Sequence, residues 1–135
     1  NRKLFPAASI YSIDQGVPQL HYGDNNLPET IFDLEYQISP LAFFQVNHQQ
    51  TEKMMEIIKD FAQIRSRDTV LDAFCGTGSI ALALAGSAHR VVGVESFKAA
   101  VKDAKRNAFN NNITNCKFIK GACEDIIPGL DVNLP

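Results

Sequence analysis

The stretch VLDAFCGTGSIA, residues 70–81, joins an apolar run to a glycine-rich turn and then to a run of small helix-forming residues. The apolar run 69–73 is typical of a short buried strand, and residues 80–85 predict a helix that ends at Gly86. Glycines allow the backbone to approach a ligand closely, and the start of a helix presents N–H groups. The stretch therefore predicts a strand, a ligand-binding turn and a helix.

Two ligand classes compete for this turn. Gly76-x-Gly78-x-x-Ala81 satisfies the dinucleotide fingerprint, in which the first glycine directly follows the strand. Here Asp72 lies at the strand end, and three residues separate it from Gly76. An acid in this place would repel a pyrophosphate and attract a cationic amino-acid group. S-adenosylmethionine, which carries a sulfonium and an α-amino group and no phosphate, fits better than NAD(P), although an NAD(P)-dependent oxidoreductase remains the alternative.

Glu95 closes the next predicted strand, residues 90–95. An acid about 20 residues beyond such a turn can accept hydrogen bonds from both ribose hydroxyls. Both cofactor classes use an acid in this place, so Glu95 predicts a nucleoside ligand without choosing between them.

The segments around the turn predict an α/β fold. Helical spacing of Met54, Ile57, Ile58, Phe61 and Ile64 predicts a helix that Asn47 or Thr51 caps. Strands are expected at 69–73, 90–95 and 116–120, and a turn at 121–125. A further helix has Phe97, Val101, Ala104 and Ala108 on one face. This alternation predicts a parallel sheet with right-handed crossovers.

Before residue 47 the pattern changes to short alternating runs, which predict strands near 9–13, 20–23, 30–32 and 34–38. We therefore expect an antiparallel β extension over residues 1–46 and the first part of an α/β domain over residues 47–135.

Length and composition set limits on the function. The chain has 135 residues, 45% hydrophobic and 21% charged, with a formal net charge of -2. These values predict one globular domain without the basic excess of a dedicated nucleic-acid-binding domain. No apolar run is long enough to span a membrane, and no secretion leader is evident. Three cysteines without metal-ligand spacing predict reduced thiols inside a cell, and no metal site.

Residues 39–47, SPLAFFQVN, place a polar Gln45 inside an apolar segment. Taken alone, the pattern favours core phenylalanines and a glutamine that binds nearby backbone.

Together, SPLAFFQVN at 39–47, LDAFCGTG at 71–78 and VVGVE at 91–95 resemble the S-adenosylmethionine-dependent RNA (uracil-5-)methyltransferases, which form 5-methyluridine in tRNA or ribosomal RNA. The resemblance runs from about Phe32 to about Pro128, and GACEDIIP at 121–128 looks most like the eukaryotic-type tRNA enzymes. It implies a Rossmann-like class I methyltransferase fold, here incomplete, with its first three parallel strands. The antiparallel extension would end a central or linker domain.

The resemblance also implies residue roles. Gln45 would lie at the cofactor, Phe74 would form an apolar wall where many relatives have tyrosine, and Glu95 would bind the ribose. Asp72, Gly76 and Gly78 would form the cofactor turn. Three further candidates are Ser79 near the methionine moiety and, as adenine-contacting acids, Asp125 and the neighbouring Glu124.

The chemistry of this family needs a cysteine thiolate that adds to uracil C6 and a glutamate that removes the C5 proton. In relatives both residues follow a later Asp-Pro-Pro-Arg motif, which this chain lacks. Cys75, Cys116 and Cys123 do not match the nucleophile's position, so we expect no catalytic residue here. The expectation is a truncated enzyme that binds cofactor without methylating; a non-catalytic interaction module is the second alternative.

The expected partner of the full-length protein is an RNA substrate, in the cytoplasm or nucleus. An unpaired sheet edge also predicts self-association of the chain. Lys98, Lys102 and Lys105 fall on one helical stripe with Arg106 beside it, which predicts a solvated helix face in preference to an RNA contact.

Overall fold

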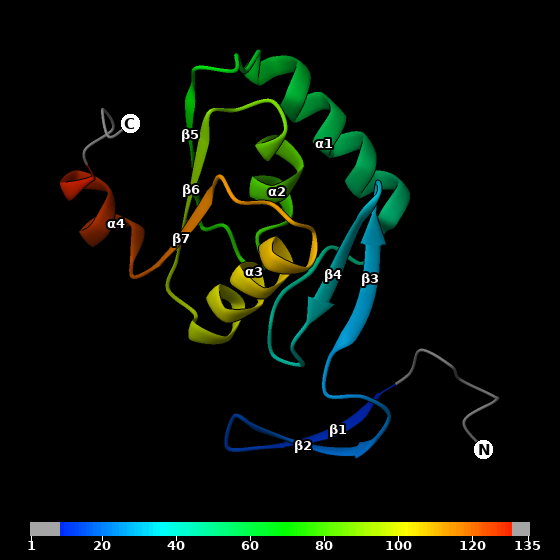
Figure 1. Cartoon of the computed structure of the whole chain (residues 1–135). Helices are drawn as coiled ribbons and strands as arrows, with labels where there is room; N and C mark the ends of the chain where they lie inside the picture. The colour runs from blue at the N-terminus through cyan, green and yellow to red at the C-terminus, as the bar shows by residue number, and fades with distance from the viewer. Residues whose placement is uncertain (1–8, 131–135) are drawn as a thin grey trace.

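The computed structural model describes residues 9–130, and its centre is a parallel sheet of three strands (Figure 1). The strands are β5 (Thr69–Ala73), β6 (Arg90–Glu95) and β7 (Cys116–Lys120), in the order β5-β6-β7. Their bounds coincide with the predicted ranges. The middle strand, β6, is buried over four consecutive residues, as its valine-rich sequence requires.

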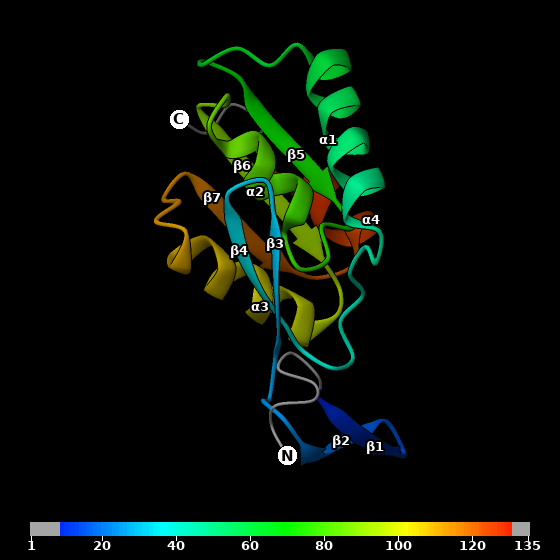
Figure 2. The same ribbon diagram turned by 90° about the vertical axis from the view of Figure 1, so that its right-hand side faces the viewer.

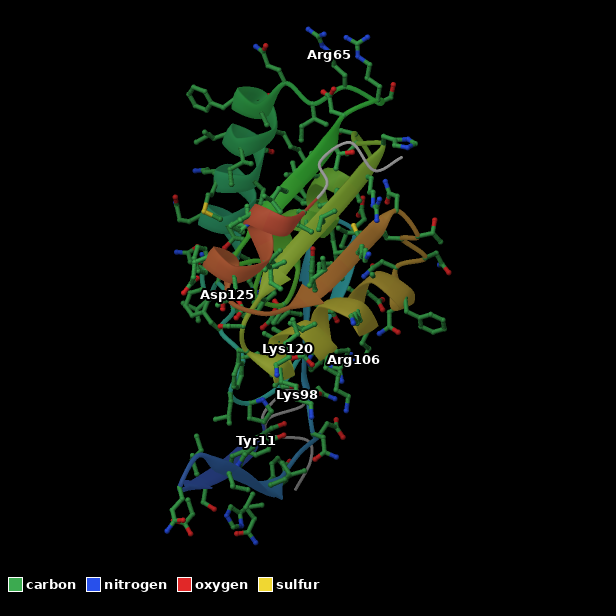
Figure 3. The ribbon with its side chains drawn as sticks, turned by 90° about the vertical axis from the view of Figure 1, so that its left-hand side faces the viewer. Tyr11, Arg65, Lys98, Arg106, Lys120 and Asp125 are labelled. Carbon is green, nitrogen blue, oxygen red and sulfur yellow. The ribbon has the colours of Figure 1, made fainter. Side chains whose placement is uncertain are left out.

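Helices α2 (Ser79–Ala85) and α3 (Lys98–Asn110) connect the strands and cover one face of the sheet (Figure 1). The strand register places Asp72, Gly93 and Phe118 in one row on this face. On the opposite face lies the short helix α4 (Cys123–Ile126), followed by a 3-10 turn (Ile127–Gly129) (Figures 1 and 3). The sequence predicted only a turn at 121–125, so α4 corrects that expectation.

Gly93 provides the space in which Phe118 packs against β6. A Cβ atom at position 93 would lie 2.6 Å from Phe118 Cδ1 and 2.8 Å from Cys75 Sγ. We expect Gly93→Ala to lower the free energy of unfolding by about 1–3 kcal/mol through overpacking. Urea denaturation followed by circular dichroism measures this loss. Gly86→Ala is the matched control, because a Cβ there meets nothing within 4 Å; equal effects of the two substitutions would contradict the prediction.

A hairpin of β3 (Leu27–Ile31) and β4 (Leu34–Ile38) forms a further layer over α2 and α3 (Figure 2). It contributes Ile31, Tyr36 and Ile38 to the hydrophobic core. Helix α1 (His48–Ala62) holds the hairpin turn, because Glu52 Oε1 accepts a 3.1 Å hydrogen bond from the Phe32 amide.

The second hairpin, β1 (Ile10–Asp14) and β2 (Val17–Tyr22), lies apart from the sheet (Figures 1 and 2). Gln15 and Gly16 both have positive φ, as a two-residue hairpin turn requires. Both hairpins are antiparallel, as expected for the N-terminal part of the chain. The domain boundary between residues 46 and 47 stays a prediction.

Three local expectations differ from the structure. Phe97 is not on the face of α3: it precedes the helix as its N-cap residue and is 42% exposed. On α1, Ile57 and Phe61 are exposed although their spacing is helical. Arg106, expected beside the lysine stripe on a solvated helix face, instead binds buried Asp103 through its Nη2 atom at 2.7 Å. By contrast, one cap expectation is confirmed: of the two candidates, Asn47 and Thr51, the N-cap of α1 is Asn47.

Candidate functional site

The turn after β5 is held in an unusual backbone conformation. Phe74, Gly76 and Gly78 all have positive φ, at 61°, 53° and 85°. The Cys75 amide donates to Val94 O at 3.0 Å, which fixes the turn against the end of β6. At Gly78 a Cβ would lie 3.1 Å from Phe118 Cζ, so only glycine lets this turn pack on the core without strain.

Glu95 and the glycine turn meet directly. The Gly76 amide donates to Glu95 Oε2 at 3.2 Å, and the Phe97 amide donates to Glu95 Oε1 at 2.7 Å. Since β6 ends at Glu95, the strand delivers this carboxylate to the carboxyl edge of the sheet. Ligands of open parallel sheets bind beyond this edge. Glu95 thus lies beside the glycine turn, at the edge of the sheet where ligands of such folds bind.

Asp72 lies beneath the glycine turn and faces α2. One carboxylate oxygen accepts a hydrogen bond from the Ala81 amide in the first turn of α2. The other, Oδ2, is buried and has no hydrogen-bond partner within residues 9–130. Burial raises the pKa of Asp72 to about 6, although the Ala81 amide opposes the rise. The site therefore contains a buried acceptor that the described chain leaves unsatisfied.

Phe74 combines a strained backbone with an exposed ring. Its side chain is 72% exposed, and a positive φ is rare for a bulky residue. Such strain persists where the surrounding structure enforces it, and it concentrates at ligand sites. The ring is available as one wall of a site at the end of β5.

Two aromatic residues, Tyr36 and Phe44, connect the end of the glycine turn with the segment that carries Gln45. The Tyr36 and Phe44 ring centroids are 5.4 Å apart, and the Tyr36 hydroxyl donates to Ser79 O at 3.4 Å. Phe44 packs on the core while Phe43 is 75% exposed, so only one of the two phenylalanines is core. Gln45, half-buried, follows Phe44 directly. Tyr36 was not predicted as part of the site, and its place inside an alternating strand gave no signal.

Asp125 and Glu124 are exposed on α4, which begins three residues after β7. The end of β7 is tied to β6 because the Gly121 amide donates to Glu95 O at 3.0 Å. Figure 3 shows Asp125 at the same end of the sheet as Lys120, the last residue of β7. Asp125 therefore lies at the carboxyl edge of the sheet, on its opposite face from α2.

The cysteines are suited to packing. Burial, strengthened by the nearby Asp72 and Glu95 carboxylates, raises the pKa of Cys75 to about 12, and burial raises that of Cys116 to about 11. Both are therefore neutral thiols near pH 7 and poor nucleophiles. Cys123 is buried with its Sγ atom 3.8 Å from Val94 O.

Residues 9–130 contain no cluster of His, Cys, Asp and Glu side chains that could hold a metal ion. Their helices are too short or too polar to cross a membrane.

The chain is similar in sequence to known RNA methyltransferases. A sequence model of the tRNA (uracil-5-)-methyltransferase family matches residues 19–132. A mouse protein, tRNA (uracil-5-)-methyltransferase homolog A, is 45% identical over 117 residues, which cover 86% of this chain and 19% of the mouse protein. An uncharacterised RNA methyltransferase of Enterococcus faecalis is 45% identical over 114 residues, 84% of this chain and 25% of the relative. The chain thus spans about a fifth to a quarter of the length of these relatives.

Solved structures agree in fold. The tRNA (uracil-54, C5)-methyltransferase of Pyrococcus abyssi, crystallised with S-adenosyl-L-homocysteine, superposes with a TM-score of 0.67 at 26% identity over 84% of this chain and 30% of that one. A putative transferase of Pyrococcus horikoshii gives 0.72 at 17% identity, which shows the fold alone, over 95% of this chain and 47% of that one. The Rossmann-like methyltransferase fold expected from the sequence is confirmed.

Proposed function

The chain belongs to the tRNA (uracil-5-)-methyltransferase family, and we propose that it forms the S-adenosylmethionine-binding part of an enzyme that methylates C5 of uridine in tRNA. The observation that carries this proposal is the 3.2 Å contact between Glu95 and the Gly76 amide, beside the strained, exposed Phe74. Ribosomal RNA is the second candidate substrate. An RNA-modifying role also agrees with an intracellular protein that keeps three free cysteines.

The residues of the turn fit the parts of this cofactor. Glu95 would accept hydrogen bonds from the ribose, and Phe74 would contact the adenosine through its exposed ring. Asp72 supplies negative charge beneath the turn, with one buried oxygen unsatisfied, which favours the cationic amino-acid end. S-adenosylmethionine, when bound, supplies an electrophilic methyl group.

Further contacts complete the proposed site. Gly76 and Gly78 let the backbone approach the cofactor, and Ser79 would lie near the methionine moiety. Gln45 and Asp125 would approach from the segment before α1 and from α4. The cysteine nucleophile of the family is assigned to none of Cys75, Cys116 and Cys123, because burial keeps the first two neutral and Cys123 is enclosed against β6.

The two alternative functions differ in what they bind. An NAD(P)-dependent oxidoreductase rests only on Gly76-x-Gly78-x-x-Ala81, a pattern that the family match accounts for without a pyrophosphate ligand. A non-catalytic interaction module would need no cofactor and would tolerate changes at Glu95.

Calorimetric titration of the chain with S-adenosylhomocysteine and with NADH tests the proposal. We expect binding of the first and none of the second. Glu95→Ala should weaken binding about 10- to 100-fold, because two charge-assisted hydrogen bonds to the ribose are lost. Glu95→Gln retains one acceptor oxygen and should give an intermediate affinity.

Glu56→Ala is the matched control, because it removes an exposed carboxylate from α1, a helix that contributes no residue to the proposed site. Binding of NADH, or unchanged affinity of Glu95→Ala for S-adenosylhomocysteine, would refute the proposed site.

A further inference from the structure

Three polar side chains, two on α3 and one on its C-cap residue, are spaced four residues apart and bind backbone groups of alternate residues along β4 and just beyond its end. The pairs are Asn111 with Glu35, Asn107 with Gln37, and Asp103 with Ser39. Four helical residues rise about 6 Å and two strand residues about 6.8 Å, so the two spacings match. The helix thereby supplies hydrogen-bond partners to the edge of β4 that β3 leaves free.

The side-chain amide of Asn107, in the middle pair, has a different donor contact from that of Asn111. Asn111 binds Glu35 with both of its amide groups: Oδ1 accepts from the Glu35 amide at 2.9 Å, and Nδ2 donates to Glu35 O at 2.6 Å and also to Asn107 O at 2.8 Å. Asn107 Oδ1 accepts from the Gln37 amide at 2.8 Å, but its Nδ2 donates to Thr77 O in the glycine turn, at 3.3 Å. The Asn107 donor is thus directed away from the strand.

Arg106 fills the position that Asn107 leaves. Its Nη2 atom donates to Gln37 O at 2.9 Å, so the strand carbonyl remains satisfied. Because Arg106 donates to Gln37 O, the Asn107 amide can donate to Thr77 O instead and so join β4 to the glycine turn. The side chains of α3, including labelled Arg106, are drawn in Figure 3.

The Asn107 contact lies in the interior. Asn107 is fully buried and Thr77 is 2% exposed, so water does not compete for these groups. The orientation of the amide is fixed, because the Gln37 N–H needs an oxygen and the Thr77 carbonyl needs an N–H. An unmade hydrogen bond in such a place leaves a buried polar group unpaired.

The same peptide is held from its other side. The Gly78 amide, which shares a peptide plane with Thr77 O, donates to Cys75 O at 2.8 Å. With both sides held, the plane cannot rotate without losing one of the two bonds. The positive φ values of Gly76 and Gly78 flank this plane.

We propose that Asn107 is a positioning residue for the cofactor site: through Thr77 O it holds the glycine turn in its binding conformation and joins that turn to β4. The effect on cofactor affinity rests on the proposed function. The effect on the turn itself does not, and can be measured without any cofactor.

Matched substitutions on one helix test this inference. Asn107→Asp keeps the acceptor for Gln37 but replaces the donor to Thr77 O with an oxygen. Asn111→Asp makes the same chemical change four residues away, where only Glu35 O and Asn107 O lose a donor. Hydrogen exchange of the backbone amides at 76–79 and titration with S-adenosylhomocysteine are measured for both, with Asn107→Ala and Asn111→Ala as a second pair in case a buried carboxylate prevents folding.

We expect about tenfold faster exchange in the turn and about tenfold weaker binding for the Asn107 variants, and less than twofold changes in either for the Asn111 variants. Equal exchange in the turn for the two positions would overturn the inference. If the unaltered chain fails to bind S-adenosylhomocysteine, the proposed function fails, while the exchange result still decides the role of Asn107.

Discussion

Replacement of Asp103 by alanine is expected to lower the free energy of unfolding by about 2–4 kcal/mol, because it removes the fully buried partner of an ion pair whose Arg106 side chain is partly exposed. Asp103 is fully buried and accepts three hydrogen bonds: from the Ser39 amide at 2.7 Å, from Ser39 Oγ at 2.8 Å and from Arg106 Nη2 at 2.7 Å. Alanine leaves the Ser39 amide without its acceptor and Arg106 without a counter-charge. Urea denaturation monitored by circular dichroism measures the loss.

A double-mutant cycle separates the ion pair from the bonds to Ser39. Arg106→Leu in the Asp103→Ala background removes the unpaired cation, so its cost there should be at least about 1 kcal/mol smaller than in the unaltered chain. Ser39→Ala serves as a milder control, since it removes the Oγ bond and keeps the amide bond. If the losses of unfolding free energy caused by Asp103→Ala and Arg106→Leu were additive in the double variant, the paired role of Asp103 and Arg106 would be contradicted.

The three parallel strands could be predicted to the residue, because each contains a short group of β-branched or apolar residues and lies between turn residues. The same reasoning found the glycine turn and the acid at the end of β6, which the structure joins through Gly76 and Glu95. These features depend on local sequence alone. They can therefore be predicted without any knowledge of tertiary contacts.

The polar contacts of α3 could not be predicted in this way, because a helix face with Asp103, Asn107 and Asn111 looks solvated. A signal was present: short amide and carboxylate side chains recur every four residues, directly beside buried Ala104 and Ala108. The contacts of Arg106 were missed for the same reason, since one of its two partners, Gln37 O, belongs to a hairpin 69 residues earlier in the chain.

Gln45, Phe74 and Asp125 illustrate a second limit. Their proposed contacts are to a ligand, and a ligand leaves no periodicity in the sequence. At Phe74 the structure shows a positive φ and an exposed ring, a combination that is uncommon and concentrates at ligand sites. The roles of Phe74, Gln45 and Asp125 remain proposals from family resemblance.

The stability of the chain should fall as pH rises from about 4 to about 6 through the contribution of Asp72. Burial raises the pKa of Asp72 from 3.8 to about 6 in the folded state. Between these values the folded chain binds more protons at this site than the unfolded chain, so the free energy of unfolding decreases with increasing pH. The contribution is fully present below pH 4, is lost above pH 6, and corresponds to about 3 kcal/mol.

Asp72→Asn isolates this contribution, because asparagine keeps an oxygen for the Ala81 amide and does not titrate. The free energy of unfolding of the variant minus that of the unaltered chain should increase by up to about 3 kcal/mol between pH 4 and pH 6.5. Urea denaturation at a series of pH values measures the difference. Asp60→Asn, at an exposed position on α1, accounts for the loss of one negative charge. A difference that stays constant with pH would contradict the prediction.

The same substitution should weaken cofactor binding at pH 7, because it removes the negative charge beneath the glycine turn. In this single variant the free energy of unfolding above pH 6 would then increase while the affinity for S-adenosylmethionine decreased. A buried carboxylate with one unsatisfied oxygen is costly to the folded chain, and packing alone would favour its replacement. Asp72→Asn could instead remove the pH dependence of stability and leave the affinity unchanged. Asp72 would then serve only as the acceptor for the Ala81 amide in α2. The acceptor for the cationic end of the cofactor would have to be another residue.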